Sequence, residues 1–76
     1  MKQLIETIVK PLVDFPEDVR VNVLEDEHRV TYQLSVNKTD MGKVIGKQGR
    51  VAKAIRTVVY AAGSSQQKKI FLEIGE

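Results

Sequence analysis

Two glycines separated by two residues, at the junction of two segments with helical patterning, are the residues whose types and spacing best suit a chemical task. They are Gly46 and Gly49, and they enclose Lys47 and Gln48. Glycine has no Cβ and tolerates positive φ, so the backbone amides of such a loop can approach a phosphate closely. The helix expected after the loop begins there, with unpaired amides and the positive end of its dipole. Lys47 and Arg50 add positive charge, so residues 46–50 predict an anion-binding loop.

The charge of the chain favours a polyanionic partner through its distribution and not through its total. The formal net charge is only +2. Residues 1–37 carry four basic and seven acidic side chains, whereas residues 38–56 carry six basic side chains and one acidic side chain, Asp40. A run of like charges usually means no more than a solvated helix face. Here the basic run coincides with the glycine loop, and this coincidence favours a contact with nucleic acid.

The length and composition predict one small globular domain. A chain of 76 residues buries only about 60% of the surface that it exposes when unfolded. Hydrophobic residues make up 42% and charged residues 29% of the chain, which is typical of a folded domain. The lack of cysteine excludes disulfides and thiolate metal sites and is compatible with a reducing cytosol. The longest wholly apolar run, residues 58–62, is too short to span a bilayer, and we expect neither a secretion signal nor a membrane anchor.

Hydrophobic periodicity predicts the element order α-β-β-α-α-β. Helical spacing marks residues 2–14, 40–45 and 51–62, and apolar–polar alternation marks residues 19–23, 30–36 and 70–74. Pro11 should bend the last turn of the first helix, and Asn37 or Thr39 can cap the short second helix. Acidic residues 25–27 supply the turn of an antiparallel hairpin.

The apolar faces of these elements predict the core. We expect the core to contain Leu4, Ile5, Ile8, Val9, Leu12, Val13, Val19, Val21, Val23, Val30, Tyr32, Leu34, Val36, Val51, Ala54, Ile55, Val58, Val59, Ala62, Ile70, Leu72 and Ile74. Gly63 should end the third helix as its C′ residue, and residues 64–67 form a polar connection. Phe71 lies on the opposite register of its strand, so it either faces outward, as a contact point for another protein, or packs under another element.

Other phosphate and catalytic motifs fail on their spacing. Residues 42–48 resemble a P-loop, but three residues instead of four separate the glycines, and Gln48 stands where Ser or Thr would hold magnesium. A dinucleotide-binding loop follows a parallel strand, whereas this loop follows a helix. His28 beside Glu25 and Glu27 is better explained as a solvated hairpin rim than as a metal site. No Ser, His and Asp set shares one pocket, so we expect no enzymatic activity and no cofactor.

The element order, together with the motif Ile45-Gly46-Lys47-Gln48-Gly49, resembles a type II KH domain. Residues 40–50, DMGKVIGKQGR, are similar to the small bacterial single-KH RNA-binding proteins of the KhpA type. A GxxG pattern alone is a weak signal, but its place after Ile45 and between two predicted helices makes the resemblance specific. The resemblance covers the whole chain, residues 1–76, as one domain. It implies an α+β fold in which a three-stranded mixed sheet carries helices on one face.

The resemblance also implies which residues contact RNA. In KH domains the GxxG loop clamps about four nucleotides of backbone, and the bases lie in a hydrophobic groove beside the loop. The expected RNA-binding residues are Lys43, Val44, Ile45, Gly46, Lys47, Gln48, Gly49, Arg50, Val51 and Lys53. Residues 46–49 form the clamp, the flanking basic residues meet phosphates, and Val44, Ile45 and Val51 line the groove. Ile55 shares their stripe, but core packing explains it more simply.

The aromatic residues indicate how bases would be contacted. Phe15, Tyr32, Tyr60 and Phe71 are scattered along the chain. Proteins that stack bases on an aromatic platform gather such residues on one surface. We therefore expect base contacts that are mostly aliphatic, with Tyr32 in the core.

Proteins similar to KhpA self-associate and pair with a larger KH-containing partner of the KhpB type, in roles tied to cell elongation and cell-wall homeostasis. We therefore expect a cytoplasmic single-stranded RNA-binding protein, an RNA chaperone or post-transcriptional regulator, that acts as a homodimer or with such a partner. Because one loop releases few counterions, a single copy of the domain should bind RNA weakly and in a salt-sensitive way. Two alternatives stay open: an adaptor whose partner makes most RNA contacts, and binding of single-stranded DNA, since the clamp reads phosphate.

Overall fold

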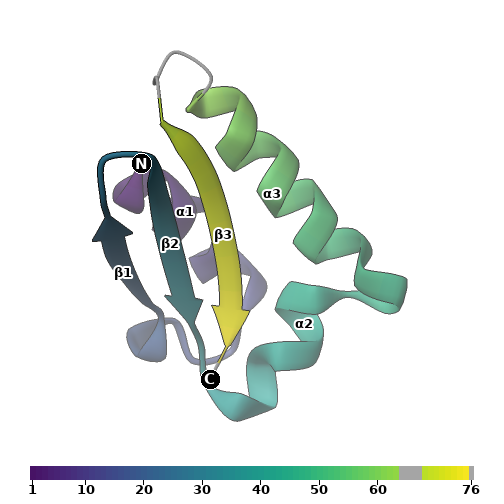
Figure 1. The fold of residues 1–76 in the computed structure, drawn as a ribbon. Helices are drawn as coiled ribbons and strands as arrows, with labels where there is room; N and C mark the ends of the chain where they lie inside the picture. The colour runs from purple at the N-terminus through teal and green to yellow at the C-terminus, as the bar shows by residue number, and fades with distance from the viewer. Residues whose placement is uncertain (64–67, 76) are drawn as a thin grey trace.

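A computed structural model of the chain describes residues 1–63 and 68–75, and in this part the elements follow the predicted order α-β-β-α-α-β (Figure 1). They are α1 (Lys2–Val9), β1 (Arg20–Glu25), β2 (Arg29–Ser35), α2 (Met41–Ile45), α3 (Arg50–Ala62) and β3 (Lys69–Gly75). Short 3₁₀ turns lie at Lys10–Leu12, Pro16–Asp18, Lys38–Asp40 and Lys47–Gly49. The expected polar connection at residues 64–67 lies outside the described residues.

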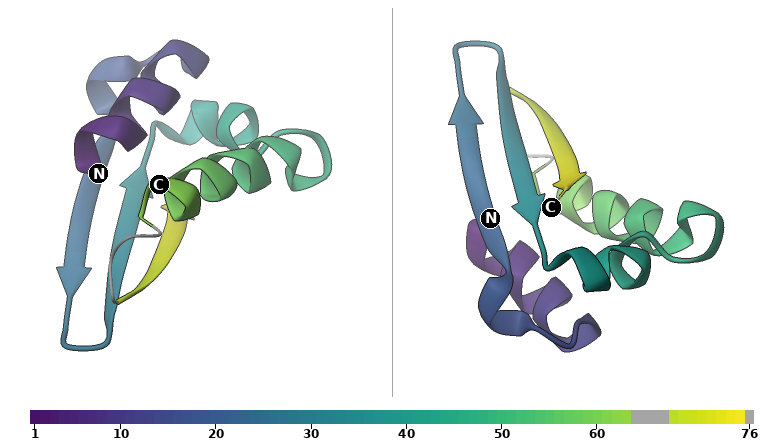
Figure 2. Two further views of the ribbon diagram at one scale, coloured as in Figure 1. Left: turned by 90° about the horizontal axis from the view of Figure 1, so that it is seen from above. Right: turned by 90° about the horizontal axis from the view of Figure 1, so that it is seen from below.

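The described strands form one three-stranded mixed sheet in the order β1-β2-β3, which confirms the predicted fold class. Strands β1 and β2 pair antiparallel, with Val21 opposite Leu34. Strands β2 and β3 pair parallel, with Tyr32 opposite Leu72. The turn of the β1–β2 hairpin projects past the helices, as Figure 2 shows. The hairpin turn itself is held by Asp26, whose carboxylate accepts hydrogen bonds from the amides of His28 and Arg29.

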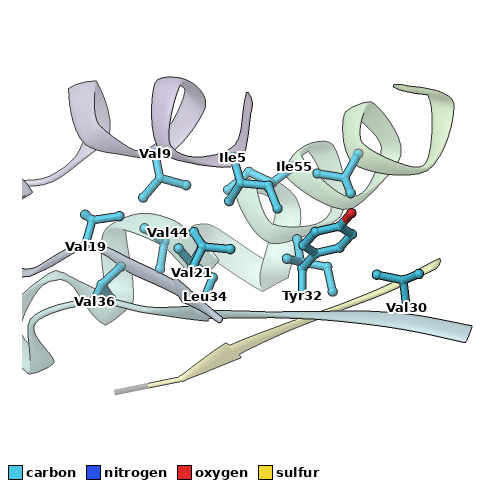
Figure 3. Close-up of a cluster of buried hydrophobic side chains, with 12 residues drawn as sticks. Ile5, Val9, Val19, Val21, Val30, Tyr32, Leu34, Val36, Val44 and Ile55 are labelled. Atoms are coloured by element: carbon cyan, nitrogen blue, oxygen red, sulfur yellow. The ribbon is translucent and has the colours of Figure 1, made fainter. Parts of the chain in front are cut away.

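The core lies between the sheet and helices α1 and α3, which cover the same face of the strands (Figure 3). Its buried residues are Ile5, Val9, Val19, Val21, Val30, Tyr32, Leu34, Val36, Val44, Ile55, Val59 and Leu72. The expectation that Tyr32 belongs to the core is therefore confirmed. The opposite face of the sheet is uncovered in the described chain, and there Phe71 lies outward with 40% of its surface exposed. The guanidinium of Arg29 lies over its ring, 5.7 Å from the centroid.

Two core predictions near the N-terminus are wrong. Helix α1 ends at Val9, and Pro11 stands in the 3₁₀ turn that follows. A 3₁₀ turn advances by a different angle per residue than an α-helix, so Leu12 no longer lies on the core face and is exposed. Val23 lies on the core-facing register of β1, but β1 is an edge strand of the sheet, and Val23 is exposed there.

The buried face of α3 also differs from the predicted one. The helix buries Ala52, Ile55 and Val59, which recur at intervals of three and four residues. Ala54 and Val58 were expected in the core but lie exposed, and so does Ala62. The helix is apolar on two sides, so periodicity alone does not select the side that packs on the sheet.

Gly63 follows the last residue of α3, as expected, but it does not adopt the left-handed conformation of a C′ glycine. Its φ is −93°. A Cβ at this position would collide with the side chain of Ile70, and Gly63 is buried. The glycine is therefore needed for the close approach of α3 to β3.

Candidate nucleic-acid interface

A buried carboxylate holds helix α2 against the rest of the domain. Asp40, immediately before α2, is fully buried. Its two carboxylate oxygens accept hydrogen bonds from the amides of Asp14 and Phe15, at 3.1 and 3.0 Å. These bonds join the chain after α1 to the start of α2, and α2 leads directly into the glycine loop. The sequence shows Asp40 only as an acidic residue in a basic segment, so this role was not predicted.

Asn37 caps the 3₁₀ turn that precedes α2. Its side-chain oxygen accepts a hydrogen bond from the amide of Thr39 at 2.9 Å. Asn37 therefore caps this turn and not α2 itself, whose N-cap residue, Asp40, makes no capping hydrogen bond with its side chain. The predicted side-chain cap of the second helix is wrong.

Replacing Asp40 by alanine should lower the free energy of unfolding by about 2 kcal/mol. The substitution leaves the amides of Asp14 and Phe15 without their acceptors in a partly buried place, and such loss costs about 1–3 kcal/mol. Urea denaturation followed by circular dichroism measures the change. Glu27→Ala, which removes an exposed carboxylate at the hairpin turn, is the control and should change stability by less than about 0.5 kcal/mol. Equal effects for both variants would contradict the role of Asp40.

The loop after α2 uses an unusual backbone at three of its four positions. Gly46, Gln48 and Gly49 have φ of 75°, 58° and 74°, and Gln48 is the sole non-glycine residue with positive φ in the described chain. At Gly46 a Cβ would lie 2.8 Å from Cβ and 2.9 Å from the amide nitrogen of Val51. At Gly49 a Cβ would meet no atom within 4 Å. Position 46 therefore requires glycine for two reasons, its positive φ and its close packing against Val51. At position 49 only the positive φ favours glycine.

The loop presents backbone donors and positive charge on one exposed surface. The amides of Gly46 and Gly49 are paired with the carbonyls of Gly42 and Gly46, at 2.9 and 3.1 Å. Lys47 and Gln48 lie between these two glycines, and both are exposed. Successive amides near a left-handed residue form a concave nest that suits an anion. The side chains of Lys47 and Arg50 are exposed around these amides.

Lys43 lies near the loop, but its ammonium is already engaged. It forms an ion pair and hydrogen bond with the carboxylate of Asp14, and its Nζ lies 3.8 Å from Oδ1 of Asp40. The hydrogen bond that Lys43 donates to Asp14 is the main cause that raises the pKa of Lys43 above its usual value. Lys43 is thus charged at neutral pH, and Asp14 competes with any phosphate for it.

The aliphatic residues expected to line the groove divide into two groups. Val44 is fully buried in the core, so its assignment to the groove wall is wrong. Ile45, next in sequence, points away from the core, with 38% of its surface exposed directly before the loop. Val51 is partly buried and packs against Gly46. Ile55 belongs to the core, which confirms that core packing explains its position better than contact with RNA.

The predicted residues that the structure brings together are therefore Ile45, residues 46–51 and Lys53. Lys53 is exposed about one turn of α3 beyond Gly49. Among residues 1–63 and 68–75, no three His, Cys, Asp or Glu side chains gather in a way that would hold a metal ion. None of the described helices has the length and apolar character needed to cross a membrane.

Comparison with known proteins agrees with the type of fold described above. Residues 2–74 match the sequence model of the family described as KhpA/KhpB, KH domain. The chain is 64% identical to the RNA-binding protein KhpA of Listeria monocytogenes, over the full length of both chains. It is 57% identical to that of Oceanobacillus iheyensis, over 97% of this chain and 99% of the relative. For KhpA of Bacillus subtilis the identity is 55%, over 97% of this chain and 91% of the relative.

A solved structure shares the fold at low sequence identity. The crystal structure of Era in complex with MgGDPNP and nucleotides 1506–1542 of 16S ribosomal RNA aligns with a TM-score of 0.64 and 16% identity. The alignment covers 97% of this chain and 28% of that one. At this identity the likeness concerns the fold alone. From the sequence match and the high identity to full-length relatives, this chain belongs to the KhpA/KhpB family of KH domains.

Proposed function

We propose that this protein binds single-stranded RNA and that residues 46–50 grip the RNA backbone. The observation that carries the proposal is the loop itself, in which Gly46, Gln48 and Gly49 have positive φ and the basic side chains of Lys47 and Arg50 are exposed. The curated relatives named RNA-binding protein KhpA support the same function.

The residues of the loop have different roles in this proposal. The backbone amides of the loop donate hydrogen bonds to one phosphate, and Gly46 and Gly49 permit the backbone shape of this nest. Lys47 contributes a compact, mobile charge, whereas the planar guanidinium of Arg50 can donate two hydrogen bonds to the next phosphate. Ile45 offers an apolar surface to a base at the edge of the loop. These groups act as a binding site, and we propose no catalysis.

The strength of binding should depend steeply on salt for so small a site. If three or four phosphates are neutralised, the logarithm of the association constant should fall with the logarithm of salt concentration with a slope of about −2 to −3. Fluorescence anisotropy of a labelled single-stranded RNA at several salt concentrations measures the slope. Competition with a DNA strand of the same sequence should require more DNA than RNA, because only RNA offers the 2′-hydroxyl. Equal competition would favour single-stranded DNA binding, and lack of any binding would refute the proposal.

Asp14→Asn should strengthen RNA binding about twofold, since it releases Lys43 from an exposed ion pair of small free energy. The salt dependence should become steeper by about 0.7, the value for one additional phosphate contact on a single strand. Anisotropy titrations of the variant measure both changes. The double variant Asp14→Asn, Lys43→Met tests the cause, because it should lose the gain. If the gain persists without Lys43, removal of the negative charge alone explains it.

In the cell, we propose that the protein is a cytoplasmic RNA chaperone or post-transcriptional regulator. Because one loop contacts few phosphates, useful affinity requires a second site on the same RNA, supplied by another copy of the chain or by a larger KhpB-type protein. The KhpA/KhpB family membership supports such a partner. The associated roles in cell elongation and cell-wall homeostasis predict altered cell length and wall in a deletion strain. Restoration by the wild type, but not by a variant without RNA binding, would link those roles to the loop.

A second candidate function, a structural adaptor, is favoured by exposed apolar residues of α3. Val58 and Tyr60 are 45% and 42% exposed, on the two flanks of the helix. In this case the scaffold serves mainly for pairing, and the partner contacts RNA. Sedimentation velocity with and without RNA separates the two functions. A stable dimer that is indifferent to charge reversal in the loop would favour the adaptor, whereas RNA-dependent sedimentation that the loop controls would favour RNA binding.

A further inference from the structure

Strand β3 has a free edge beside helix α3, as Figures 1 and 2 both show. The amide of Lys69 donates to the carbonyl of His28, and the carbonyl of Gly75 accepts from the amide of Val36, both at 3.1 Å. In a parallel pair, every second residue bonds to the neighbouring strand and the residues between point their backbone groups the other way. Ile70, Leu72 and Ile74 therefore direct their backbone N–H and C=O groups toward the free edge.

One side chain of α3 reaches this edge. The Nε of Arg56 donates a hydrogen bond to the carbonyl of Leu72 at 3.3 Å, and the side chain is partly buried. Among residues 1–63 and 68–75, no hydrogen bond or ion pair involves its two terminal nitrogens. A guanidinium carries its donors in a fixed plane. Arg56 is thus oriented by one hydrogen bond and retains two donor groups for a ligand.

The position of Arg56 relative to the loop suits a strand that the loop holds. Arg56 follows Gly49 by seven residues, which is nearly two full turns, so both lie on the same side of α3. The rise along the helix between them is roughly 10 Å. A bound segment of about four nucleotides can therefore place a base at Arg56 while its backbone is clamped at residues 46–50.

We propose that Arg56 reads a base of the bound strand and gives this protein a preference for bases that present two adjacent acceptors. Guanine does so through O6 and N7, and cytosine through O2 and N3, whereas neither adenine nor uracil presents such a pair. The terminal nitrogens of Arg56 donate to the two acceptors, and the bond from Nε to Leu72 fixes the plane of the guanidinium. This inference rests on the proposed RNA binding and adds a specificity-determining residue to it.

The test compares four six-nucleotide RNAs, GUGUGU, CUCUCU, AUAUAU and UUUUUU, by fluorescence anisotropy at one salt concentration. The wild type should bind the guanine or the cytosine strand about tenfold more tightly than the adenine and uracil strands, within the range for one bidentate contact. Which of the two binds better identifies the base. Arg56→Lys retains the charge and a donor for Leu72 but lacks the planar pair, so it should lose the preference while binding of AUAUAU and UUUUUU stays unchanged.

The controls separate a recognition role from a structural one. Arg20→Lys, the same substitution in the edge strand β1 on the other side of the sheet, should leave the preference intact. If Arg56→Lys is not folded by circular dichroism, Arg56→Gln retains a donor for Leu72 without the guanidinium and serves in its place. An equal loss for all four RNAs, or an unchanged preference, would overturn the proposal and leave Arg56 as a cover for the edge of β3. Failure of the wild type to bind any RNA would instead refute the proposed function.

Discussion

Replacing Lys47 and Gln48 together by aspartate is expected to abolish RNA binding while leaving the fold intact. Both side chains are exposed at the tip of the loop, so the change should shift the midpoint of thermal unfolding by no more than a few degrees. Gln48 has φ of 58° and ψ of 26°, and aspartate tolerates this left-handed region better than most residues. Two carboxylates beside the loop amides would repel a phosphate and also compete with it for the hydrogen bonds that these amides donate. An affinity loss of at least a hundredfold in anisotropy titrations is the expected result.

The chain offers a matched control for this variant. Lys2 and Gln3 are also adjacent and exposed, and they lie in the first turn of α1, far from the loop in Figures 1 and 2. Lys2→Asp with Gln3→Asp changes the net charge by the same amount. This control should reduce RNA affinity only slightly, through the overall charge. If both double variants lose affinity equally, net charge and not the loop controls binding, and the assignment of the clamp would be wrong.

Gly46→Ala is expected to destabilise the domain by about 3 kcal/mol or more. The new Cβ would lie 2.8 Å from Cβ and 2.9 Å from the amide nitrogen of Val51, which lies in the first turn of α3. Positive φ adds about 1–2 kcal/mol of strain for a residue with a Cβ. Because Val51 also packs against the core, the clash cannot be relieved at the surface alone. Urea denaturation measures the loss of stability.

Two other glycines provide graded controls for Gly46. Gly49→Ala places alanine in the left-handed region, at φ of 74° and ψ of 15°, without a clash, and should cost about 1–2 kcal/mol. Gly42 lies within α2 with no atom near a Cβ, so Gly42→Ala should be neutral or stabilise by up to about 1 kcal/mol. The free energy of unfolding should therefore decrease from Gly42→Ala, the most stable variant, through Gly49→Ala to Gly46→Ala, the least stable. Equal effects at Gly46 and Gly42 would show that the loop adapts to side chains and is not rigidly shaped.

The elements of the fold could be predicted because each carries a strong periodic signal. Alternation in residues 30–36 and 70–74 predicted the strands and placed Phe71 on the opposite register from Leu72, but it did not decide that Phe71 faces outward. The two glycines of the loop were informative for the same reason, since positive φ is a property that sequence alone can indicate. Pro11 likewise marked the point near which α1 ends.

The parts that could not be predicted depend on contacts between distant segments. Asp40 is buried because amides 25 and 26 residues earlier in the chain donate to it, and no local pattern indicates such partners. Lys43 is held by Asp14 for a similar reason. Val44 and Ile45 are chemically alike, and only the packing of α2 decides that the first enters the core and the second faces the loop. The same holds for Arg56, whose partner lies on β3.

The most direct test of the RNA clamp is to follow the backbone amide resonances of the protein by NMR while single-stranded RNA is added. We predict that the largest chemical-shift changes occur at the amides of residues 47–50, and that the amides of the outer side of α3 and of the open sheet face change little. Changes concentrated around Val58 and Tyr60, or around Phe71, with the loop amides unmoved, would contradict RNA binding by the loop.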